Sequence, residues 1–416
     1  MRKITDRLKR LHPVTIILLA IIFVAIVSRL WHLGLPTSYI YDEAYYVKYA
    51  KQFLDGTYWI DVHPIISEVL IAVGIVIFGD HSWAWRLLPV LAGIAIIPLS
   101  YFIAARIFKN RWIGVLTAFL LTFDGMMLVQ SRAALLDIFM TFFVLCGYLF
   151  FLKFLERDKL GYLAAAGAFF GLALSCYWVT VPLWILVIVW FVWERRRRRK
   201  QWLWGLLYLI VLPLVIYILS FLFANLGNET FFGYLKYWHT RSFTFHYDLR
   251  SPHTYGSRWY SWPIMYQPVW YLQSEMSDGT VASIVTLGNP IIWFTAIPAF
   301  FYSLYLLFVK RYHAVLIPLL SFSLLYFGWA AIKRPEFVYY IVPVLPFYFM
   351  LLSKMIFDIY KKWRVAAIVW LVAVVACFLF FYPLNVHRPI SRAYYNAAIW
   401  FDNWQIKKDV KSSSGS

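Results

Sequence analysis

Long apolar runs separated by short polar turns dominate the chain. A bilayer core of about 30 Å needs roughly 20 apolar residues per helix, so each run predicts a membrane-spanning helix. The third run is short and ends at Phe123-Asp124-Gly125, which predicts a bent span that continues toward Gln130. We therefore expect an all-α polytopic membrane protein with about 11 transmembrane helices, at 14–33, 83–105, 112–125, 136–154, 160–177, 178–194, 203–224, 288–309, 314–331, 337–356 and 365–382.

The positions of Lys and Arg predict how these spans are oriented. Cytoplasmic loops carry an excess of basic residues, and the run Arg195–Lys200 is the strongest such signal in the chain. With the N-terminus cytoplasmic, most Lys and Arg fall on the inner side, and an odd number of spans places the C-terminus outside. Nearly all of the net charge of +19 then lies on the cytoplasmic side, where anionic lipids attract it.

Two long segments, about 34–82 and about 225–287, fall outside the spans on the external side and are rich in Trp, Tyr, Pro and His. Long loops on a rigid scaffold are where binding and catalysis concentrate. We expect one integral-membrane domain over 1–411, with a C-terminal four-span part over about 288–411. Residues 412–416 (SSSGS) are typical of a linker.

Composition excludes several classes of protein. Only 14% of the residues are charged and 62% are apolar, which excludes a disordered chain and disfavours a soluble nucleic-acid-binding protein despite the basic balance. The three cysteines, Cys146, Cys176 and Cys377, lie in apolar segments without pairing motifs, so we expect buried thiols.

Ionisable residues close to a membrane are costly, so each one is a candidate site residue. Asp42 and Glu43 follow the first span and could form a general base with a supporting acceptor. In the structural alternative, Asp42 caps the N-terminus of a helix and Glu43 lies in the first turn of that helix.

The segment Asp61-Val62-His63-Pro64, with Glu68 after it, forms a second cluster. Its spacing matches no recognised zinc pattern, so hydrogen bonding from His63 to an anion is favoured over metal binding. A helix that begins at Pro64 could lie in the membrane interface.

Four further groups lie near the predicted outer rim. Arg86 stands at the entrance of the second span, as a ligand or a snorkelling side chain. Arg132 and Asp137 are poor helical neighbours but could form a structural ion pair across a bend. The remaining two groups are Lys333-Arg334-Pro335-Glu336 and the stretch from His253 to Arg258, which suits a sugar or phosphate surface or aromatic anchoring.

Carboxylates and separate cations on one face fit a phosphate ester, since arginine binds phosphate and a carboxylate can take a proton. The membrane location implies a lipid-linked phosphate. No Ser/His/Asp or Cys/His arrangement suggests a nucleophilic residue.

Several segments, in order along most of the chain, resemble the protein O-mannosyltransferase family. They are YDEAYYVKYAKQFLDGTYWIDVHP at 41–64, WRLLP at 85–89, LTFDGMMLVQSRAALLDIFMTFF at 121–143, SPHTYGSRWYSWP at 251–263, LGNPIIW at 287–293, RPEFVYYIVPVLPF at 334–347, and YPLNVHRPISRAYYNAAIWFDNW at 382–404. The second external segment is too short for the β-trefoil module of eukaryotic members, so the resemblance is to the compact prokaryotic type.

The resemblance implies a GT-C type glycosyltransferase of the prokaryotic cell membrane with its active site on the external face. Such an enzyme transfers mannose from a polyprenyl-phosphate-mannose donor to Ser/Thr hydroxyls of an acceptor protein, with inversion at the anomeric carbon. Asp42 and Glu43 are then the catalytic pair, in which Asp42 is the expected base and Glu43 helps to position the acceptor or the base. Arg86 is the leading phosphate ligand. Further donor-site positions are implied at His63, Arg132, Asp137, His253, Arg258 and Arg334.

No metal or other cofactor is expected, because arginines can stabilise the charge that develops on the leaving phosphate. Two alternatives stay open. A related enzyme could use a glycolipid or polysaccharide acceptor, and a transporter would bind the lipid without turnover. The clustering of charges at one face disfavours the transporter.

Overall fold

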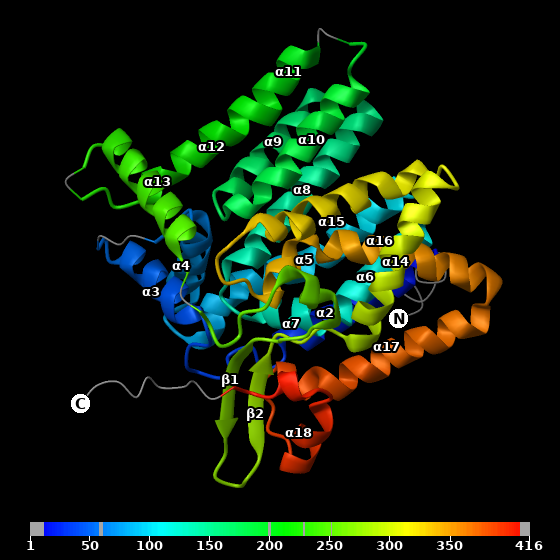
Figure 1. Ribbon diagram of the computed structural model, residues 1–416. Helices are drawn as coiled ribbons and strands as arrows, with labels where there is room; N and C mark the ends of the chain where they lie inside the picture. Colours follow the sequence, from blue (N-terminus) through cyan, green and yellow to red (C-terminus); the bar gives the residue numbers. More distant parts are fainter. Residues whose placement is uncertain (1–11, 58–60, 199–200, 228, 251, 408–416) are drawn as a thin grey trace, which may run out of the picture.

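Helices form almost all of the structure, a computed structural model that describes residues 12–57, 61–198, 201–227, 229–250 and 252–407 (Figure 1). Most of the predicted N-terminal basic segment, the last two residues of the run 195–200 and the predicted linker 412–416 lie outside these residues. The elements are α2 (Pro13–Leu30), α3 (Glu43–Leu54), α4 (Ile66–Phe78), α5 (Ser82–Ile107), α6 (Arg111–Thr122), α7 (Gly125–Arg132), α8 (Leu136–Arg157), α9 (Leu160–Leu174), α10 (Val181–Glu194), α11 (Trp202–Leu206), α12 (Leu212–Ser220), α13 (Phe231–Asp248), β1 (Trp270–Glu275), β2 (Val281–Val285), α14 (Pro290–Phe308), α15 (Leu316–Gly328), α16 (Leu345–Lys362), α17 (Arg364–Asn385) and α18 (Arg392–Ala398).

The predicted spans are confirmed as helices at their expected places. Within the described residues, eight helices are long and apolar enough to cross a membrane, or nine if a bent pair counts as one span. The two other predicted spans fall on shorter apolar helices, Leu160–Leu174 and Trp178–Glu194. The count of eleven and the orientation therefore stay predictions. Helix α4, which was expected near Pro64, is also present.

The bend predicted after the third apolar run is confirmed, since α6 and α7 meet at 64°. Asp124 stabilises the bend. Its Oδ1 accepts a hydrogen bond from the Met127 amide at 2.9 Å and caps α7. Its Oδ2 accepts from the Asn289 amide at 3.1 Å and from the indole nitrogen of Trp293 at 2.7 Å. This carboxylate therefore ties the bent segment to the beginning of α14.

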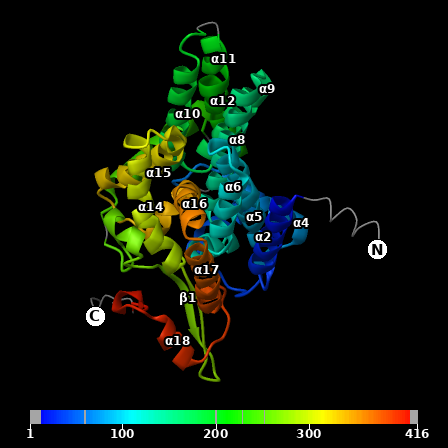
Figure 2. The ribbon, with the colours of Figure 1, turned by 90° about the vertical axis from the view of Figure 1, so that its right-hand side faces the viewer.

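A short hairpin lies beside the helical bundle. Strands β1 and β2 pair antiparallel, with Gln273 opposite Ser283, and a bridge from Val281 to Ile390 adds the chain before α18. Figures 1 and 2 show the hairpin and α18 together at one end of the molecule, with α17 running from that end.

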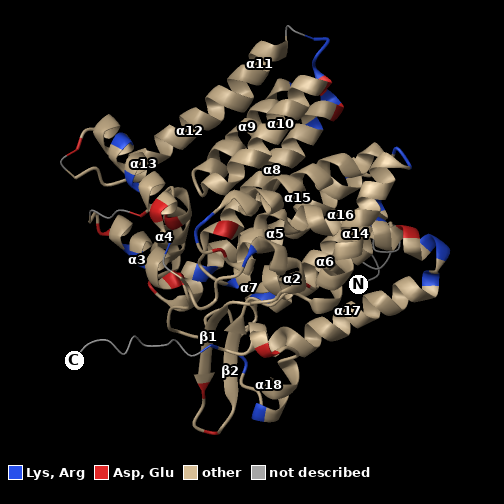
Figure 3. Ribbon diagram, viewed as in Figure 1, with Lys and Arg blue, Asp and Glu red and all other residues tan. Residues whose placement is uncertain are grey.

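Charged residues divide between two sides of the structure. Figure 3 shows Lys and Arg at the turns that join α10 to α11, α14 to α15 and α16 to α17, on the side opposite the hairpin and α3. This division agrees with the basic loops expected on one membrane face.

Candidate active site

Asp42 and Glu43 are neighbours in sequence but have opposite surroundings. Glu43, in the first turn of α3, is fully buried. Its Oε1 accepts from Arg86 Nε at 2.8 Å and from the Ala134 amide at 2.9 Å. Its Oε2 accepts from Arg86 at 2.7 Å and from the Ile40 amide at 3.0 Å. This carboxylate has no free position for a substrate, so it anchors the start of α3.

Arg86 is buried completely, and its guanidinium is already occupied. Besides Glu43, it donates to the carbonyl oxygens of Leu33 at 3.2 Å, Pro36 at 2.8 Å and Ser38 at 3.1 Å. These contacts fix the loop that precedes Asp42. The phosphate-binding role expected for Arg86 stays a prediction, but its contacts in the structure are those of a positioning residue.

Asp42, the N-cap residue of α3, is half-buried and makes no capping hydrogen bond with its side chain. Burial, and then the neighbouring charge of Asp61, raises the pKa of Asp42 to about 7. A carboxylate with a pKa near neutral and no partner to hold it can accept a proton at physiological pH.

Aromatic rings surround this carboxylate on one side. The ring of Tyr41 stacks on Tyr271 of β1, with centroids 4.5 Å apart, and its hydroxyl lies 3.3 Å from that of Tyr339. Gln130 of α7 donates to the Tyr271 hydroxyl at 2.6 Å. The bent span and the hairpin therefore both support the residue before Asp42.

Arg132 and Asp137 occupy separate places, and no ion pair joins them in the part of the chain that the structure describes. Arg132 instead caps the end of α2, where it donates to the carbonyl oxygens of Arg29 at 2.6 Å and Trp31 at 2.8 Å. Asp137 lies in the first turn of α8 and interacts electrostatically with Asp42. The expected pair across a bend is thus wrong, because helix capping occupies the guanidinium.

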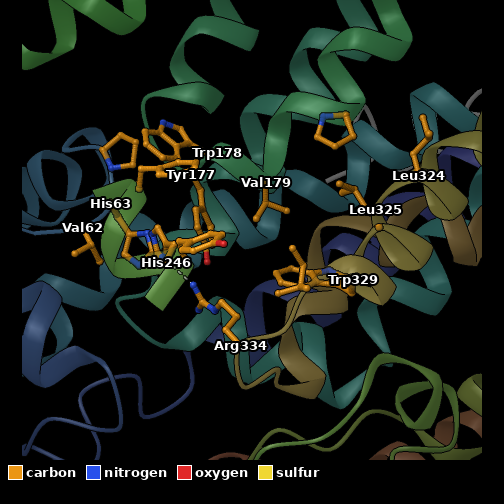
Figure 4. Close-up of a pocket in the computed structure, with 16 residues that line it drawn as sticks. Val62, His63, Tyr177, Trp178, Val179, His246, Leu324, Leu325, Trp329 and Arg334 are labelled. Carbon is orange, nitrogen blue, oxygen red and sulfur yellow. Dashed lines mark hydrogen bonds between the residues drawn. The ribbon is translucent and has the colours of Figure 1, made fainter. Parts of the chain in front are cut away.

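A second cluster of polar groups lines a cavity of about 440 Å³ between α10, α13 and α15. Figure 4 shows His63, His246 and Arg334 converging at one end of this cavity, with Leu324, Leu325 and Trp329 along the rest. The rings of His63 and His246 lie 5.2 Å apart. The cavity thus has a polar end and an apolar wall.

Two buried nitrogen atoms at the polar end have no hydrogen-bond partner among the described residues, Arg334 Nε and His63 Nδ1. The other nitrogens of Arg334 bond His246 Nδ1 and donate to the Tyr340 hydroxyl at 2.7 Å. Burial, and then Arg334, lowers the pKa of His246 to about 4, and burial lowers that of His63 well below its usual range. Both imidazoles are neutral at pH 7.

The carboxylate and the cavity face a shared set of tyrosines. Tyr177 and Tyr340 each interact electrostatically with Arg334, with Asp42 and with Asp137. Tyr177 also packs edge-on against His63, at 4.7 Å between ring centroids. The two tyrosines therefore lie within electrostatic range of both Arg334 and Asp42.

His253 and Arg258 lie farther from this centre. The His253 ring packs edge-on against Phe337, which stacks on Tyr339. Arg258 is exposed and interacts with Glu336. The Glu336 Oε2 accepts from the Trp259 amide at 2.9 Å, so this acid holds the loop around Arg258. His253 therefore adjoins the Asp42 side, and Arg258 lies at the surface.

The sequence did not single out His246, which lies within the aromatic helix α13. The sequence around His246 gave only a weak indication of a site residue, since a histidine among aromatic residues is common in a long external segment. The suspected metal ligands Asp61, His63 and Glu68 line a small space. Among the described residues, no group of three or more His, Cys, Asp or Glu is arranged to hold a metal ion.

Solved structures with the same architecture define the class of fold. A chain of the S. cerevisiae protein O-mannosyltransferase Pmt1–Pmt2 complex bound to the sugar donor superposes with a TM-score of 0.84 over 96% of this chain and 93% of that one, at 14% identity. ArnT from Cupriavidus metallidurans bound to undecaprenyl phosphate gives 0.63 over 88% and 64%, at 18% identity. The chain therefore has the GT-C glycosyltransferase fold.

Family models match nearly the whole chain. Two described as dolichyl-phosphate-mannose-protein mannosyltransferase cover residues 62–221 and 19–82, and the C-terminal four-span region of protein O-mannosyltransferase covers 231–404. The polyprenol-phosphate-mannose–protein mannosyltransferase of Mycobacterium tuberculosis is 26% identical over 92% of this chain and 91% of its own, and that of Corynebacterium glutamicum is 24% identical over 92% of both. The chain belongs to the protein mannosyltransferase family, in its compact prokaryotic form.

Proposed function

We propose that this protein transfers mannose from a polyprenyl-phosphate-mannose donor to Ser and Thr hydroxyls of acceptor proteins. The family and the named relatives support the reaction. The observation that carries the assignment of roles is the contrast between Asp42, which is partly exposed and makes no capping hydrogen bond with its side chain, and Glu43, which is saturated by hydrogen bonds from the described residues. One carboxylate is free for chemistry because the other holds it in place.

In the proposed reaction, Asp42 accepts the proton of the acceptor hydroxyl as the hydroxyl oxygen attacks the anomeric carbon. The bond from that carbon to the phosphate oxygen breaks, and the phosphate leaves with the electron pair. Attack on the face opposite the phosphate converts a β-linked donor into an α-linked product. The base and the phosphate site must then lie on opposite sides of the sugar, and Tyr340 interacts electrostatically with both Asp42 and Arg334.

We place the donor phosphate at the polar end of the cavity. Arg334 carries a fixed positive charge there, and neutral His63 and His246 can donate hydrogen bonds. The apolar wall from Leu324 to Trp329 suits the first isoprene units of the lipid.

The other predicted site residues take supporting roles. Arg86 positions Glu43 and the loop before Asp42, and Arg132 caps α2. Asp137, which interacts electrostatically with Asp42, would face the sugar, and His253 and Arg258 stay proposed donor-site residues. We further propose that the site opens to the external face of a prokaryotic cell membrane and that no metal takes part.

An in vitro transfer assay tests this function. Purified protein is given polyprenyl-phosphate-mannose, the glucose and arabinose analogues, and peptides that contain Ser/Thr or only Ala. Mannose transfer to the Ser/Thr peptide alone is expected. Transfer to an added glycolipid but to no peptide would favour the alternative acceptor, and donor binding without turnover would favour a transporter.

A further inference from the structure

A second apolar groove lies between α2 and α17, outside the proposed active site. It encloses about 770 Å³, with Phe23 and Val27 on one wall and Leu379 and Tyr382 on the other. Phe23 and Leu379 are each more than half exposed, so the groove opens toward the lipid that surrounds these two spans. A hydrogen bond from the Tyr382 hydroxyl to the Ser28 carbonyl, at 2.9 Å, joins its walls.

Three basic side chains line the end of the groove that adjoins the active-site loops: His32, His387 and Arg388. The Nε2 atom of His387 is buried and has no hydrogen-bond partner within the part of the chain that the structure describes. Arg388 forms no ion pair among the described residues, and its side chain is exposed. These unused donors favour an anionic ligand.

Backbone conformation supports a functional role for the same end. His32 and His387 both adopt positive φ angles, 52° and 56°, which non-glycine residues rarely adopt. Such conformations cost free energy and are retained where the surrounding structure imposes them, often at ligand sites. Here they bring two imidazoles from distant parts of the chain to one cavity.

The apolar part of the groove is long. A neighbouring cavity of about 780 Å³ shares Val24 and Phe123 with it and extends to Lys361, near the opposite end of the spans. A hydrocarbon chain attached to an anionic head at Arg388 can therefore continue along α2 toward the middle of the membrane.

We propose that this groove binds one anionic phospholipid, with its phosphate at His32, His387 and Arg388 and an acyl chain between α2 and α17. Bulk membrane lipid is the source, because both walls are open to the bilayer. The site differs from the donor cavity, which is lined by α10, α13 and α15. The bound head contacts the loop whose carbonyl oxygens hold Arg86, so the lipid would stabilise the anchoring of Glu43.

Native mass spectrometry of the full chain tests the proposal without an activity assay. The protein is exchanged into detergent with equal phosphatidylglycerol and phosphatidylcholine. Wild type should retain phosphatidylglycerol preferentially, and Arg388→Gln should reduce this retention by about fivefold. Adding His387→Ala to Arg388→Gln should reduce the retention of phosphatidylglycerol further. Lys48→Ala, which removes an exposed charge on α3, is the matched control and should retain the lipid as wild type does.

Equal retention by wild type and Arg388→Gln, or no preference for the anionic lipid in wild type, would overturn the proposal. So would a lipid-free dimer in which a second copy covers the groove. Arg388 is exposed, so its substitution should leave the melting temperature in lipid-free detergent unchanged, and a folding defect would then not explain a loss of retention. The result is independent of mannose transfer, so it stands or fails separately from the proposed function.

Discussion

Arg86 and Glu43 form a buried, bidentate ion pair, with Nε 2.8 Å from Oε1 and Nη2 2.7 Å from Oε2. The pair joins the second span to the first long loop. It explains how two adjacent carboxylates can have different tasks, because one is fixed and the other is left free.

Substitution of Arg86 should therefore lower the stability of the protein, and this effect should exceed any direct effect on donor binding. Arg86→Ala leaves Glu43 buried without a counter-charge, which costs about 3–5 kcal/mol. The melting temperature in detergent should fall clearly. Lys51→Ala breaks a pair with Asp80 that is partly exposed, and should cost at most about 1 kcal/mol. If Arg86→Ala kept wild-type stability and only raised KM for the donor, Arg86 would be a phosphate ligand after all.

Asp42→Asn should abolish most transfer while leaving the fold intact. The side chain makes no capping hydrogen bond, so its exchange removes no contact of that kind. Loss of a general base reduces kcat by about 10²- to 10⁴-fold. Asp55→Asn, at the exposed end of the same helix, is the control and should transfer normally. Wild-type kcat in Asp42→Asn would show that another group takes the proton.

The rate of transfer should depend on pH through Asp42. The base must be ionised, and burial raises its pKa to about 7, so kcat should increase with pH up to about 7 and level off above it. The measurement is kcat from pH 5 to 9 at saturating donor. A rate that is flat from pH 5 to 8 would mean that the active base has an ordinary carboxylate pKa or is absent.

Arg334→Gln should weaken donor binding. A hydrogen bond to a charged group contributes about 1.5–3 kcal/mol, so the donor KM should rise by about ten- to a hundredfold. Lys333→Gln changes the exposed neighbouring residue and should leave KM unaltered. If Arg334→Gln reduced kcat but left KM unchanged, the donor phosphate would have to bind outside this cavity.

Transfer should continue in the presence of a chelator. In the proposed site, Arg334 and hydrogen bonds from the imidazoles stabilise the negative charge on the leaving phosphate, so no metal is needed. The assay is run with excess EDTA and then with added Mg²⁺ or Mn²⁺. Loss of activity that a divalent ion restores would contradict the assignment.

Much of the fold could be predicted because span length and hydropathy depend on local sequence. The bend at Asp124 was also visible, since Asp and Gly interrupt an apolar run. The role of Arg86 was harder to predict. Its partner Glu43 lies 43 positions away, and a lone arginine at a span entrance is equally compatible with binding lipid phosphate.

The pairings of the candidate residues were hard to predict. Asp42, His63 and Arg334 all adjoin the proposed site, and their roles stay predictions. Arg132 does not pair with Asp137 but bonds the end of α2, because unpaired helix carbonyls compete for its donors. His246 lines the cavity because of the way α13 packs, and no local sequence motif predicts this packing.

The contacts of Asp124 have a consequence for biosynthesis. Two of its hydrogen-bond partners, Asn289 and Trp293, are made 165 and 169 residues later than Asp124 itself. While the nascent chain is shorter than this, the carboxylate bonds only within its own turn, at Met127. Arg132 can bond the end of α2 as soon as α7 has been made, but the bonds that tie the bend to α14 form only after the ribosome has completed the start of α14. This part of the active centre therefore matures late in translation.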